Sequence, residues 1–401
     1  MRTTYPRNVL ISGAGIAGPA LAYWLVRGGA RVTIVERHGE LRRGGQAVDF
    51  RGPVHRAVLD RMGVWDAICA ERTRRTDHAL YDRAGCTVAR LPAVMMGGDV
   101  EIQRGDLCRI FYERSGATYR FGDSIRALHD RGDGVDVDFE HGDAERFDLV
   151  VGADGLRSRT RAVAFGPHER YLKHHGYRIA GCTIENILGV EHTGFTYSVP
   201  GRAVSVSIAR DPREARALFV WAAPPRDDRG QRTDRDAKAE ATRELAGAGW
   251  EVPRLLEQLA RATDVYDDDI CTAHVDRYAR GRVVLLGDAA WGGTLGGQGT
   301  SCAVVGAYVL AGELASRPVD EALARYEQWM RPYATRCQKG AAHVGGFFAP
   351  RSRFAIGLRN TVYRWLSSRP MEWLFERLVK SAAESFQLPD YSLAPALAQA
   401  A

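Results

Sequence analysis

Apolar and polar positions near the start of the chain follow the order strand, helix, strand. Residues 8–12 form a short apolar run that suits a buried parallel strand, and residues 19–27 place their apolar side chains on one helical face. Gly28 ends the helical pattern, and residues 30–35 form a second apolar run that leads to Glu36. This order predicts a β-strand, helix, β-strand unit with parallel strands.

A second group of apolar runs in the middle of the chain predicts a separate sheet. Residues 77–90 have the pattern of a hairpin that turns at residues 83–85. Residues 236–262 predict one or two helices. Four further runs, separated by turn signals, are typical of strands and span residues 177–184, 194–199, 203–208 and 217–222. Beyond residue 331 an aromatic-rich helical pattern predicts packing helices, with pocket cover or an amphipathic membrane contact as alternatives.

The turn after the first strand carries a glycine pattern. Gly13, Gly15 and Gly18 have the spacing G-x-G-x-x-G. Gly13 allows a tight turn, Gly15 lets the backbone approach a pyrophosphate, and Gly18 lets helix and strand pack closely. The helix N-terminus offers N–H groups to phosphate, and Glu36 is placed to accept hydrogen bonds from a ribose. The pattern predicts dinucleotide binding, and a turn that serves only packing is the alternative.

Composition and charge exclude some classes of protein. The chain has 401 residues, of which 45% are hydrophobic and 26% are charged. This length and hydrophobic content are sufficient for the cores of two interleaved domains. The formal net charge of +6 comes almost entirely from arginine, and no basic run with interleaved aromatics is present. We therefore expect no nucleic-acid partner. The nearest basic cluster, Arg72, Arg74 and Arg75, suits a solvated face or an approach surface for an anionic nucleotide.

Cysteine usage and apolar run lengths bear on location. Seven cysteines without a C-x-x-C motif favour reduced thiols and a cytoplasmic protein. Residues 1–7 are too short and polar for a signal peptide, and we expect no membrane span because no apolar run reaches about 18 residues. We expect no metal site, since His174 and His175 have no acidic or cysteine ligand at metal spacing. Residues 299–303 nearly match a hydrolase nucleophile elbow but end in alanine.

Three further segments combine a strand or a helix start with a turn that contains glycine or aspartate. A strand, an Asp-Gly turn and a helix start occupy residues 147–161, an apolar strand ending in Gly-Asp occupies residues 281–290, and a glycine turn before a helix occupies residues 296–299. Together with Arg104 and the first glycine turn, they resemble the group A flavoprotein monooxygenases. These are the para-hydroxybenzoate-hydroxylase-like aromatic hydroxylases, which include tetracycline-inactivating and polyketide-tailoring enzymes. The resemblance runs from about residue 8 to about residue 330 and implies FAD rather than NAD.

The resemblance also implies roles for individual residues. Arg104 matches the arginine that reaches the ribityl-phosphate region of FAD, and Asp288 matches the aspartate that holds a ribityl hydroxyl. Taken alone, Asp288 would be a cap, Arg104 a solvated arginine and the Asp154-Gly155 pair a plain turn. The implied cofactor-binding residues are Gly13, Gly15, Ala17, Gly18, Glu36, Arg37, Arg43, Gly45, Arg104, Asp154, Gly155, Asp288, Gly296, Gly297, Gln298 and Gly299.

The fold implied by the resemblance is α/β, with a Rossmann-like FAD-binding domain interleaved with a mixed β-sheet substrate domain and followed by C-terminal helices. We expect the FAD-binding domain to be discontinuous. The expected boundaries are 1–72, 98–170 and 277–330 for the FAD-binding domain, 73–97 and 171–276 for the substrate-binding domain, and 331–401 for the C-terminal helical segment.

The implied activity is that of a single-component flavin monooxygenase, a monomer or homodimer. NADPH or NADH would act as transient reductant, and O2 would form a C4a-hydroperoxyflavin that hydroxylates an aromatic or polyketide-like small molecule. One departure from the family pattern is that residues 289–295 contain no proline after Gly-Asp. This leaves open a relative that keeps FAD but catalyses a non-oxidative cyclisation or rearrangement. A non-enzymatic FAD-binding protein is the remaining alternative.

Four aromatic side chains are candidates for the substrate pocket. They are Tyr197, Phe219, Trp221 and Trp291. Aromatic and uncharged, they favour a flat hydrophobic substrate over a small carboxylate. The alternation of a strand leaves the choice of facing residues ambiguous by one register step. Trp291 either stacks near the flavin or the substrate or is a packing residue.

Overall fold

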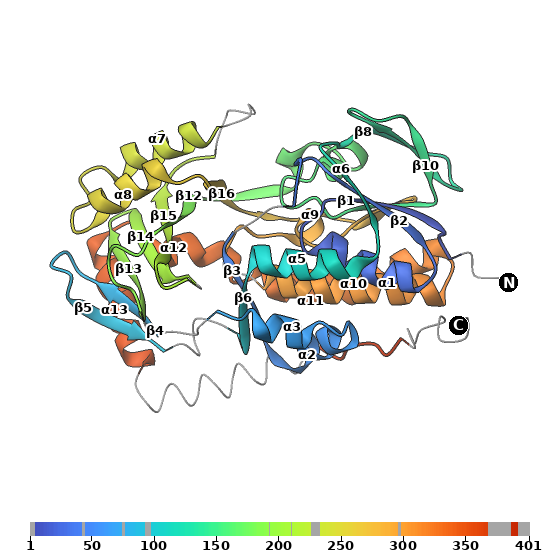
Figure 1. The fold of residues 1–401 in the computed structure, drawn as a ribbon. Helices are drawn as coiled ribbons and strands as arrows, with labels where there is room; N and C mark the ends of the chain where they lie inside the picture. Colours follow the sequence, from blue (N-terminus) through green and yellow to red (C-terminus); the bar gives the residue numbers. More distant parts are fainter. Residues whose placement is uncertain are drawn as a thin grey trace.

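The computed structural model describes residues 5–41, 45–73, 77–92, 98–191, 193–209, 211–225, 233–295, 298–367 and 386–391. Two large sheets lie at opposite ends of the molecule (Figure 1). The long helices α10 (Gly299–Ser316) and α11 (Val319–Gln338) run beneath the six-stranded sheet (Figure 1).

The first sheet has six strands in the order β17-β18-β11-β1-β2-β7. Strand β1 pairs in parallel with β2 on one side and with β11 on the other. Strand β11 also pairs in parallel with β18, and β18 pairs antiparallel with β17. Helix α1 (Ala17–Arg27) follows β1, so the predicted strand, helix, strand unit is confirmed. The strand bounds are β1 Asn8–Ser12, β2 Arg31–Glu36, β7 Thr118–Phe121, β11 Leu149–Gly152, β17 Ala279–Arg280 and β18 Val283–Leu285.

Strand β1 is apolar throughout because both of its faces are covered. Val9 and Ile11 pack in the core beneath α1 and α10, whereas Leu10 packs on the other face against Val137 and Phe139. The latter two belong to a three-stranded sheet that packs on this face of the six-stranded sheet. A parallel strand buried on both sides has this continuous hydrophobic pattern. The three strands are β8 (Ile125–Asp130), β9 (Val135–Phe139) and β10 (Glu145–Phe147).

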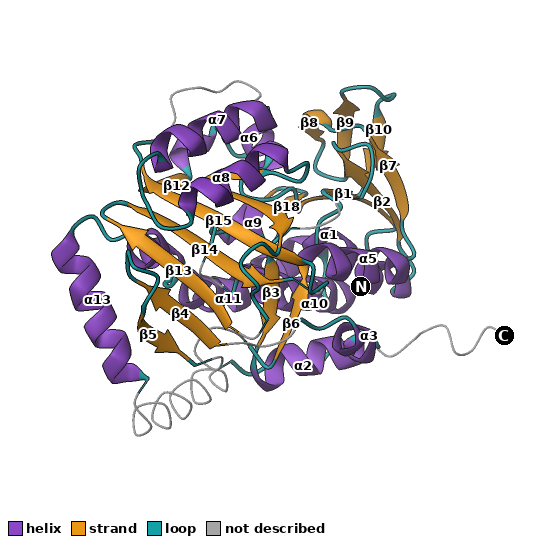
Figure 2. Ribbon diagram, turned by 60° about the vertical axis from the view of Figure 1, so that its left-hand side comes forward, coloured by secondary structure: helices purple, strands orange, loops and turns teal. Residues whose placement is uncertain are grey.

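The second sheet has seven strands in the order β16-β12-β15-β14-β13-β4-β5, and helices α7 and α8 cover one of its faces (Figure 2). The predicted hairpin is confirmed by the antiparallel pair β4 and β5, and the four predicted strands correspond to β12 to β15. The bounds are β4 Asp77–Tyr81, β5 Thr87–Leu91, β12 Leu172–Glu185, β13 Thr193–Val199, β14 Arg202–Ile208, β15 Glu214–Ala222, β16 Tyr266–Ala273, α7 Asp234–Leu245 and α8 Val252–Arg261.

The remaining elements join the two sheets. The two-stranded sheet of β3 and β6 lies between them, and α5 packs beside α1. Where one domain ends and the next begins stays a prediction. The bounds are β3 Ala47–Phe50, β6 Val100–Gln103, α2 Gly52–Arg61, α3 Trp65–Ala70, α5 Arg104–Ser115, α6 Arg159–Ala164, α9 Asp288–Trp291, α12 Val344–Phe348 and α13 Arg353–Leu366.

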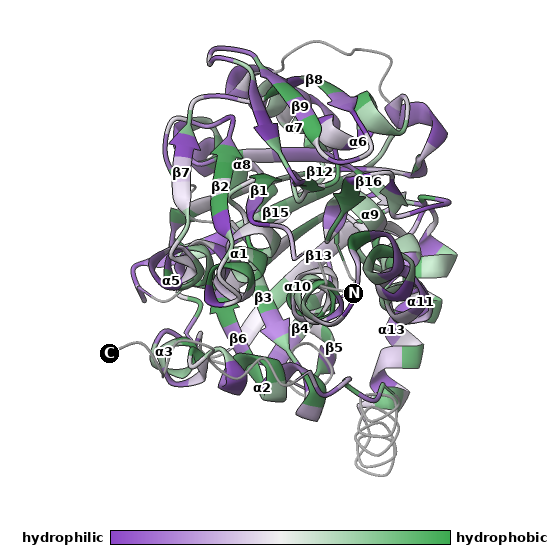
Figure 3. Ribbon diagram, turned by 90° about the vertical axis from the view of Figure 1, so that its right-hand side faces the viewer, coloured by the Kyte–Doolittle hydropathy of each residue, from purple (hydrophilic) through white to green (hydrophobic). Residues whose placement is uncertain are grey.

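Helix α10 corrects one expectation from the sequence. Over residues 299–316 it is long and apolar enough to cross a membrane by length and composition, although we expected no such run. Most of this helix is buried, and it lies between α1 and α11 (Figure 3). Its apolar character is therefore that of a central core helix, hydrophobic all round because neighbours surround it.

Candidate functional site

Three glycines shape the turn between β1 and α1. An added Cβ at Gly13 would lie 2.5 Å from the carbonyl oxygen of Ala153, and one at Gly18 would lie 2.1 Å from that of Gly13. The packing of the chain itself therefore requires both glycines. At Gly15 the nearest atom to an added Cβ is Arg104 Nη2, at 3.9 Å, so this position keeps open space above the turn.

The carboxylate of Glu36 lies at the end of β2 beside this turn. Its Oε2 accepts a hydrogen bond from the Ala14 N–H at 2.9 Å, and its Oε1 accepts one from the His38 N–H at 3.0 Å. These bonds hold the acid next to the glycine turn and leave each oxygen a second acceptor position. Of the neighbouring predicted residues, Arg37 is exposed and Ala17 is buried in the first turn of α1.

Arg104 begins α5 and reaches over the glycine turn. Its stem packs against Gly45, where an added Cβ would lie 3.3 Å from Arg104 Cβ, and its backbone N–H donates to Gln46 O at 3.2 Å. Within the described ranges, the guanidinium of Arg104 has no hydrogen-bond partner. A guanidinium without an internal partner is suited to bind an anionic ligand group.

Asp288 follows β18 at the start of α9. An added Cβ at Gly299, the first residue of α10, would lie 3.2 Å from Asp288 Oδ1, so the two segments face each other. Burial raises the pKa of the Asp288 carboxyl, the charge of Arg104 lowers it, and Asp268 raises it. Its side chain accepts no hydrogen bond from any residue that the structure describes.

Asp154 has a different environment from Asp288. Its Oδ2 accepts hydrogen bonds from the N–H and hydroxyl of Thr160, at 2.8 and 2.9 Å, and from Ser12 Oγ at 3.3 Å. Its Oδ1 accepts the hydroxyl of Ser158 at 2.5 Å. The carboxylate therefore ties the start of α6 to the end of β1. Gly155, with φ of +81° and no atom within 4 Å of an added Cβ, faces open space.

The structure thus brings together most of the predicted cofactor-binding positions at one edge of the six-stranded sheet. Arg104 faces Gly15, Gly45 and Asp288, and Asp288 faces Gly299. Gln298 directly precedes this turn of α10, whereas Arg43, Gly296 and Gly297 lie outside the described residues. The open glycine turn, together with a guanidinium and a half-buried carboxylate that make no hydrogen bond to any described residue, fits the pyrophosphate and ribityl groups of FAD.

Three of the four predicted pocket residues lie elsewhere, which corrects that prediction. Tyr197, Phe219 and Trp221 are at most 1% exposed and pack in the core between the sheet and helices α7 and α8. The Tyr197 hydroxyl donates to Ala248 O at 2.7 Å. The reason is the register of the strand: on β15 the positions next to them, beginning with Leu218, face the opposite side of the sheet.

Trp291 is also a core residue and not a pocket residue. It is 2% exposed and lies against Gly306 of α10, with ring-centroid distances of 5.1 Å to Tyr278 and 6.3 Å to Tyr326. The glycine at position 306 provides the space, since an added Cβ there would lie 3.1 Å from the indole. The packing alternative for Trp291 therefore holds.

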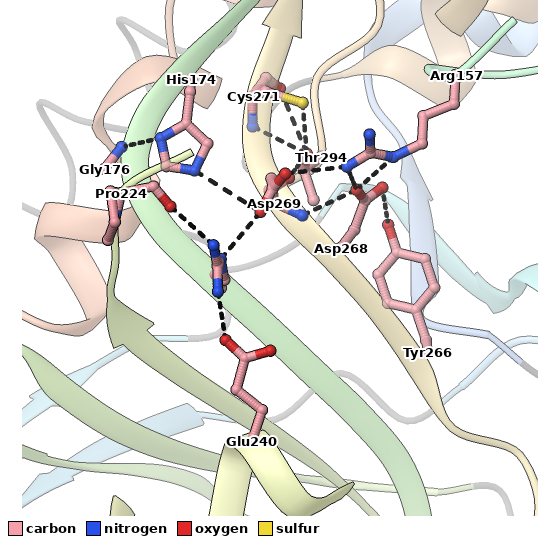
Figure 4. A network of polar contacts seen from close by, with 11 residues as sticks. Arg157, His174, Gly176, Pro224, Glu240, Tyr266, Asp268, Asp269, Cys271 and Thr294 are labelled. Atoms are coloured by element: carbon pink, nitrogen blue, oxygen red, sulfur yellow. Dashed lines mark hydrogen bonds and ion pairs between the residues drawn. The ribbon is translucent and has the colours of Figure 1, made fainter. Parts of the chain in front are cut away.

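A charged cluster on β16 was not anticipated from the sequence. Figure 4 shows Arg157 between Asp268 and Asp269: its Nη2 donates to Asp268 Oδ1 at 2.9 Å and to Asp269 Oδ2 at 3.0 Å. Tyr266 donates its hydroxyl to Asp268 Oδ2 at 3.2 Å. Arg178 Nε lies 3.2 Å from Asp269 Oδ1. The available signal was a run of three aspartates, residues 267–269, inside an otherwise apolar strand.

Arg216 is a second functional candidate that the sequence did not single out. It lies on β15 and donates to the carbonyl oxygen of Gly45, next to Arg104. Its other contacts are to Thr183 and to Asp264, whose Oδ2 lies 3.1 Å from Arg216 Nη1. Arg216 therefore fixes the seven-stranded sheet over the segment that carries Gly45.

Comparison with known proteins agrees with this geometry. The model of the FAD binding domain family matches residues 7–341. A flavin-dependent monooxygenase of Legionella longbeachae is 31% identical over 394 residues, which cover 96% of this chain and 98% of that protein. An uncharacterized protein of Mycobacterium tuberculosis is 42% identical over 324 residues, or 77% of this chain and 85% of that protein. The crystal structure of the tetracycline destructase Tet(55) superposes with a TM-score of 0.81 at 32% identity, covering 97% of this chain and 100% of that one.

The chain therefore belongs to the FAD-binding family of flavin-dependent monooxygenases. It is an oxidoreductase with an α/β fold and FAD as its cofactor, as the sequence resemblance implied. Which residues contact FAD, and which substrate is oxidised, are questions for the proposals that follow.

Proposed function

We propose that this chain is a single-component monooxygenase that takes reducing equivalents from NADPH or NADH and inserts one atom of O2 into an aromatic or polyketide-like small molecule. The observation that carries the proposal is the convergence of the open turn at Gly15 with Arg104 and Asp288, whose side-chain polar groups make no hydrogen bond to any residue that the structure describes. When bound, FAD would supply the redox chemistry. The chain's own residues would bind it, orient it and exclude water.

In this proposal the glycine turn and the α1 N-terminus bind the pyrophosphate of FAD. Arg104 neutralises its negative charge, and Asp288 accepts a hydrogen bond from a ribityl hydroxyl. Glu36 accepts from the ribose. Asp154 acts indirectly, since its oxygens already bind Ser12, Ser158 and Thr160 and so position the turn at Gly155.

The substrate would lie against the face of the seven-stranded sheet that α7 and α8 leave uncovered. Partly buried apolar side chains on this side include Leu218, Tyr266, Leu295 and Phe348. Apolar contacts of this kind favour a flat hydrophobic substrate. The similarity to tetracycline destructases, at 30–32% identity over nearly the whole chain, supports a polycyclic substrate of comparable size.

The decisive experiment is a substrate panel on protein loaded with FAD. Aromatic polyketides, tetracyclines and small phenolic acids are each scored for accelerated NADPH and NADH oxidation, oxygen uptake and gain of one oxygen atom in the product. The proposal expects the polycyclic compounds to stimulate all three. Turnover without consumption of reductant or oxygen would instead establish the non-oxidative alternative, and stimulation by small phenolic acids alone would refute the proposed polycyclic substrate.

A further inference from the structure

Helix α13 packs at the β5 end of the seven-stranded sheet and contacts β5 and β13 (Figure 2). Its inner face is half-buried, and no residue of the helix is fully buried. Arg359 on this inner face holds the helix in place, because its Nη1 donates to the carbonyl oxygens of Phe347 and Phe348 at 2.8 and 3.0 Å. The Tyr363 ring lies 5.4 Å from the ring of Phe347. The helix is therefore docked through one face only, and its other face is presented to the surroundings.

The outer face of α13 carries an apolar stripe. Phe354, Leu358 and Val362 have 81%, 55% and 41% of their surface exposed, and Trp365 has 61%. Their spacing of four, four and three residues places them on one side of the helix. Among the described residues, the only other large hydrophobic side chain that is exposed is Tyr112, on α5. Exposed apolar side chains are therefore concentrated on this one helix, as they are at surfaces that bind another molecule.

Positive charge is concentrated in the same part of the chain. Residues 332–367 contain six basic residues and no acidic one, and the formal net charge of the whole chain is +6. The rest of the chain is therefore formally neutral. Three of these basic residues, Arg351, Arg353 and Arg364, are exposed on α13 or directly before it. None of the three forms an ion pair with a described residue, so their charges are available to an anionic partner.

Arg353 and Arg364 lie along one edge of the apolar stripe. They are eleven residues apart, which is about three helical turns, so they share one side of the helix. Each directly precedes an aromatic residue of the stripe, Phe354 or Trp365, and therefore lies about 100° around the helix from it. An arginine at such a border extends its apolar stem along the stripe and keeps its guanidinium in the polar layer. Helices with this arrangement lie in the plane of a membrane interface.

An anionic phospholipid surface matches both parts of this outer face. Acyl chains accommodate the apolar stripe, and lipid phosphates accept hydrogen bonds from the guanidinium groups. A second copy of the chain matches it less well, because a symmetric contact through α13 would bring Arg353 and Arg364 close to the same arginines of the other copy. The charge of the helix therefore favours a membrane over a dimer as its partner.

We propose that α13 binds this protein peripherally to membranes that contain anionic phospholipids. Phe354, Leu358 and Val362 enter the boundary between headgroups and acyl chains, and Arg353 and Arg364 bind lipid phosphates. The helix lies on the membrane surface and does not span it. This attachment is independent of the proposed function, although an apolar substrate that dissolves in lipid would be concentrated at the same surface.

The test measures binding of the full, FAD-loaded chain to sedimented lipid vesicles. Vesicles of phosphatidylcholine alone are compared with vesicles of phosphatidylcholine and phosphatidylglycerol in equal amounts. The wild type should bind the mixed vesicles at least about tenfold more tightly at low salt, and added salt should release it because the charge contacts are screened. Phe354→Ser combined with Leu358→Ser should weaken this binding by about tenfold or more. Arg353→Gln combined with Arg364→Gln should weaken it by a similar factor.

Two matched controls remove similar groups from other parts of the surface. Tyr112→Ser removes an exposed aromatic side chain, and Arg126→Gln combined with Arg131→Gln removes two exposed arginines of the three-stranded sheet. Both should bind vesicles as the wild type does. The proposal is overturned if the wild type does not bind the mixed vesicles, if it binds phosphatidylcholine equally well, or if either α13 variant binds as the wild type does.

Thermal unfolding and the molar mass in solution complete the test. Both α13 variants should keep the melting temperature and the mass of the wild type, because the changed side chains face outward. A lower melting temperature in the apolar variant would show that the stripe packs against the chain itself. A wild-type dimer that this variant converts to a monomer would show that the stripe joins two copies. Either result overturns the proposal.

Discussion

At the scale of single residues, the glycines of the first turn have different roles: Gly18 is required for packing, and Gly15 leaves space for a ligand. A Cβ at Gly15 finds open space, whereas a Cβ at Gly18 would lie 2.1 Å from a carbonyl oxygen. We therefore expect Gly15→Val to fold with a nearly unchanged melting temperature and to lose FAD, because the side chain fills the space needed by the pyrophosphate. Gly18→Ala should be destabilised by about 1–3 kcal/mol or more.

Both variants are checked by thermal unfolding and by FAD titration followed through flavin fluorescence. Gly39→Ala is the neutral control, since nothing lies within 4 Å of an added Cβ there. Full FAD affinity in Gly15→Val would show that this turn serves only packing.

The half-buried carboxylate of Asp288 predicts opposite effects on stability and on binding. Its pKa is raised in the folded protein, so ionisation is easier in the unfolded chain, and the carboxylate destabilises the cofactor-free fold as pH rises above 3.8. Asp288→Asn should therefore raise the melting temperature without FAD at pH 7. The same change should weaken FAD binding by about 1.5–3 kcal/mol through loss of one charge-assisted hydrogen bond.

Arg104→Ala provides the comparison, because it should weaken FAD binding to a similar degree without the gain in stability. Unchanged FAD dissociation constants in both variants would place the cofactor elsewhere. An Asp288→Asn protein that is less stable than the wild type would contradict the assignment of Asp288 as a ligand-binding group without an internal partner.

At the scale of elements, the sequence identified most strands and helices but not which face of a strand meets which neighbour. Alternation along β15 is visible in the sequence, yet both faces are apolar because one packs on α7 and α8 and the other packs on α12. Hydrophobic pattern alone cannot distinguish two apolar faces. The cluster on β16 was missed for a related reason: its partners Arg157 and Arg178 come from distant segments, so their contacts are set by tertiary structure.

The register of β15 can be tested with neighbouring residues. Phe219→Ala should cost about 3–5 kcal/mol of stability, because it opens a cavity in the core under α7 and α8, and should leave the KM for substrate unchanged. Leu218→Ala should cost less stability and raise KM roughly tenfold, as expected for about 1–3 kcal/mol of lost apolar contact. Chemical unfolding and steady-state kinetics with the best substrate of the panel decide the matter. A reversed pattern would return the pocket to the face first predicted.

At the scale of the whole molecule, the order of the motifs was more informative than any one of them. Asp154 and Asp288 each follow a strand of the six-stranded sheet, yet Asp154 binds its own turn, whereas Asp288, at the start of α9, faces the site. Parallel strand order brings the glycine turn after β1 and Asp288 after β18 to one edge of the six-stranded sheet, where Arg104, which follows β6 of a different sheet, reaches over the turn. The sequence could therefore predict the fold and the residues that make up the site. It could not predict which of these residues hold a local turn and which face the ligand position.

Acid sensitivity should affect both halves of the molecule in one pH range. His55 on α2 and His78 on β4 are buried, and burial lowers the pKa of each from 6.5 to about 4. In the fold each ring is neutral, with Nε2 of His55 2.7 Å from the Tyr333 hydroxyl and Nε2 of His78 2.7 Å from Thr196 Oγ1. Below pH 6.5 the unfolded chain gains protons that the folded chain does not, so stability falls as pH decreases from 6.5 towards 4.

The urea midpoint of the cofactor-free protein should therefore decrease steeply over this range. His78→Gln retains a hydrogen-bonding side chain. It should reduce the slope of the free energy of unfolding against pH by the contribution of one proton, which is about 1.4 kcal/mol per pH unit. His129→Gln, which removes a half-exposed histidine from the three-stranded sheet, is the comparison variant. An acid dependence that is the same in His78→Gln as in the wild type would show that other groups, and not the buried histidine of the seven-stranded sheet, set the acid limit of this half of the molecule.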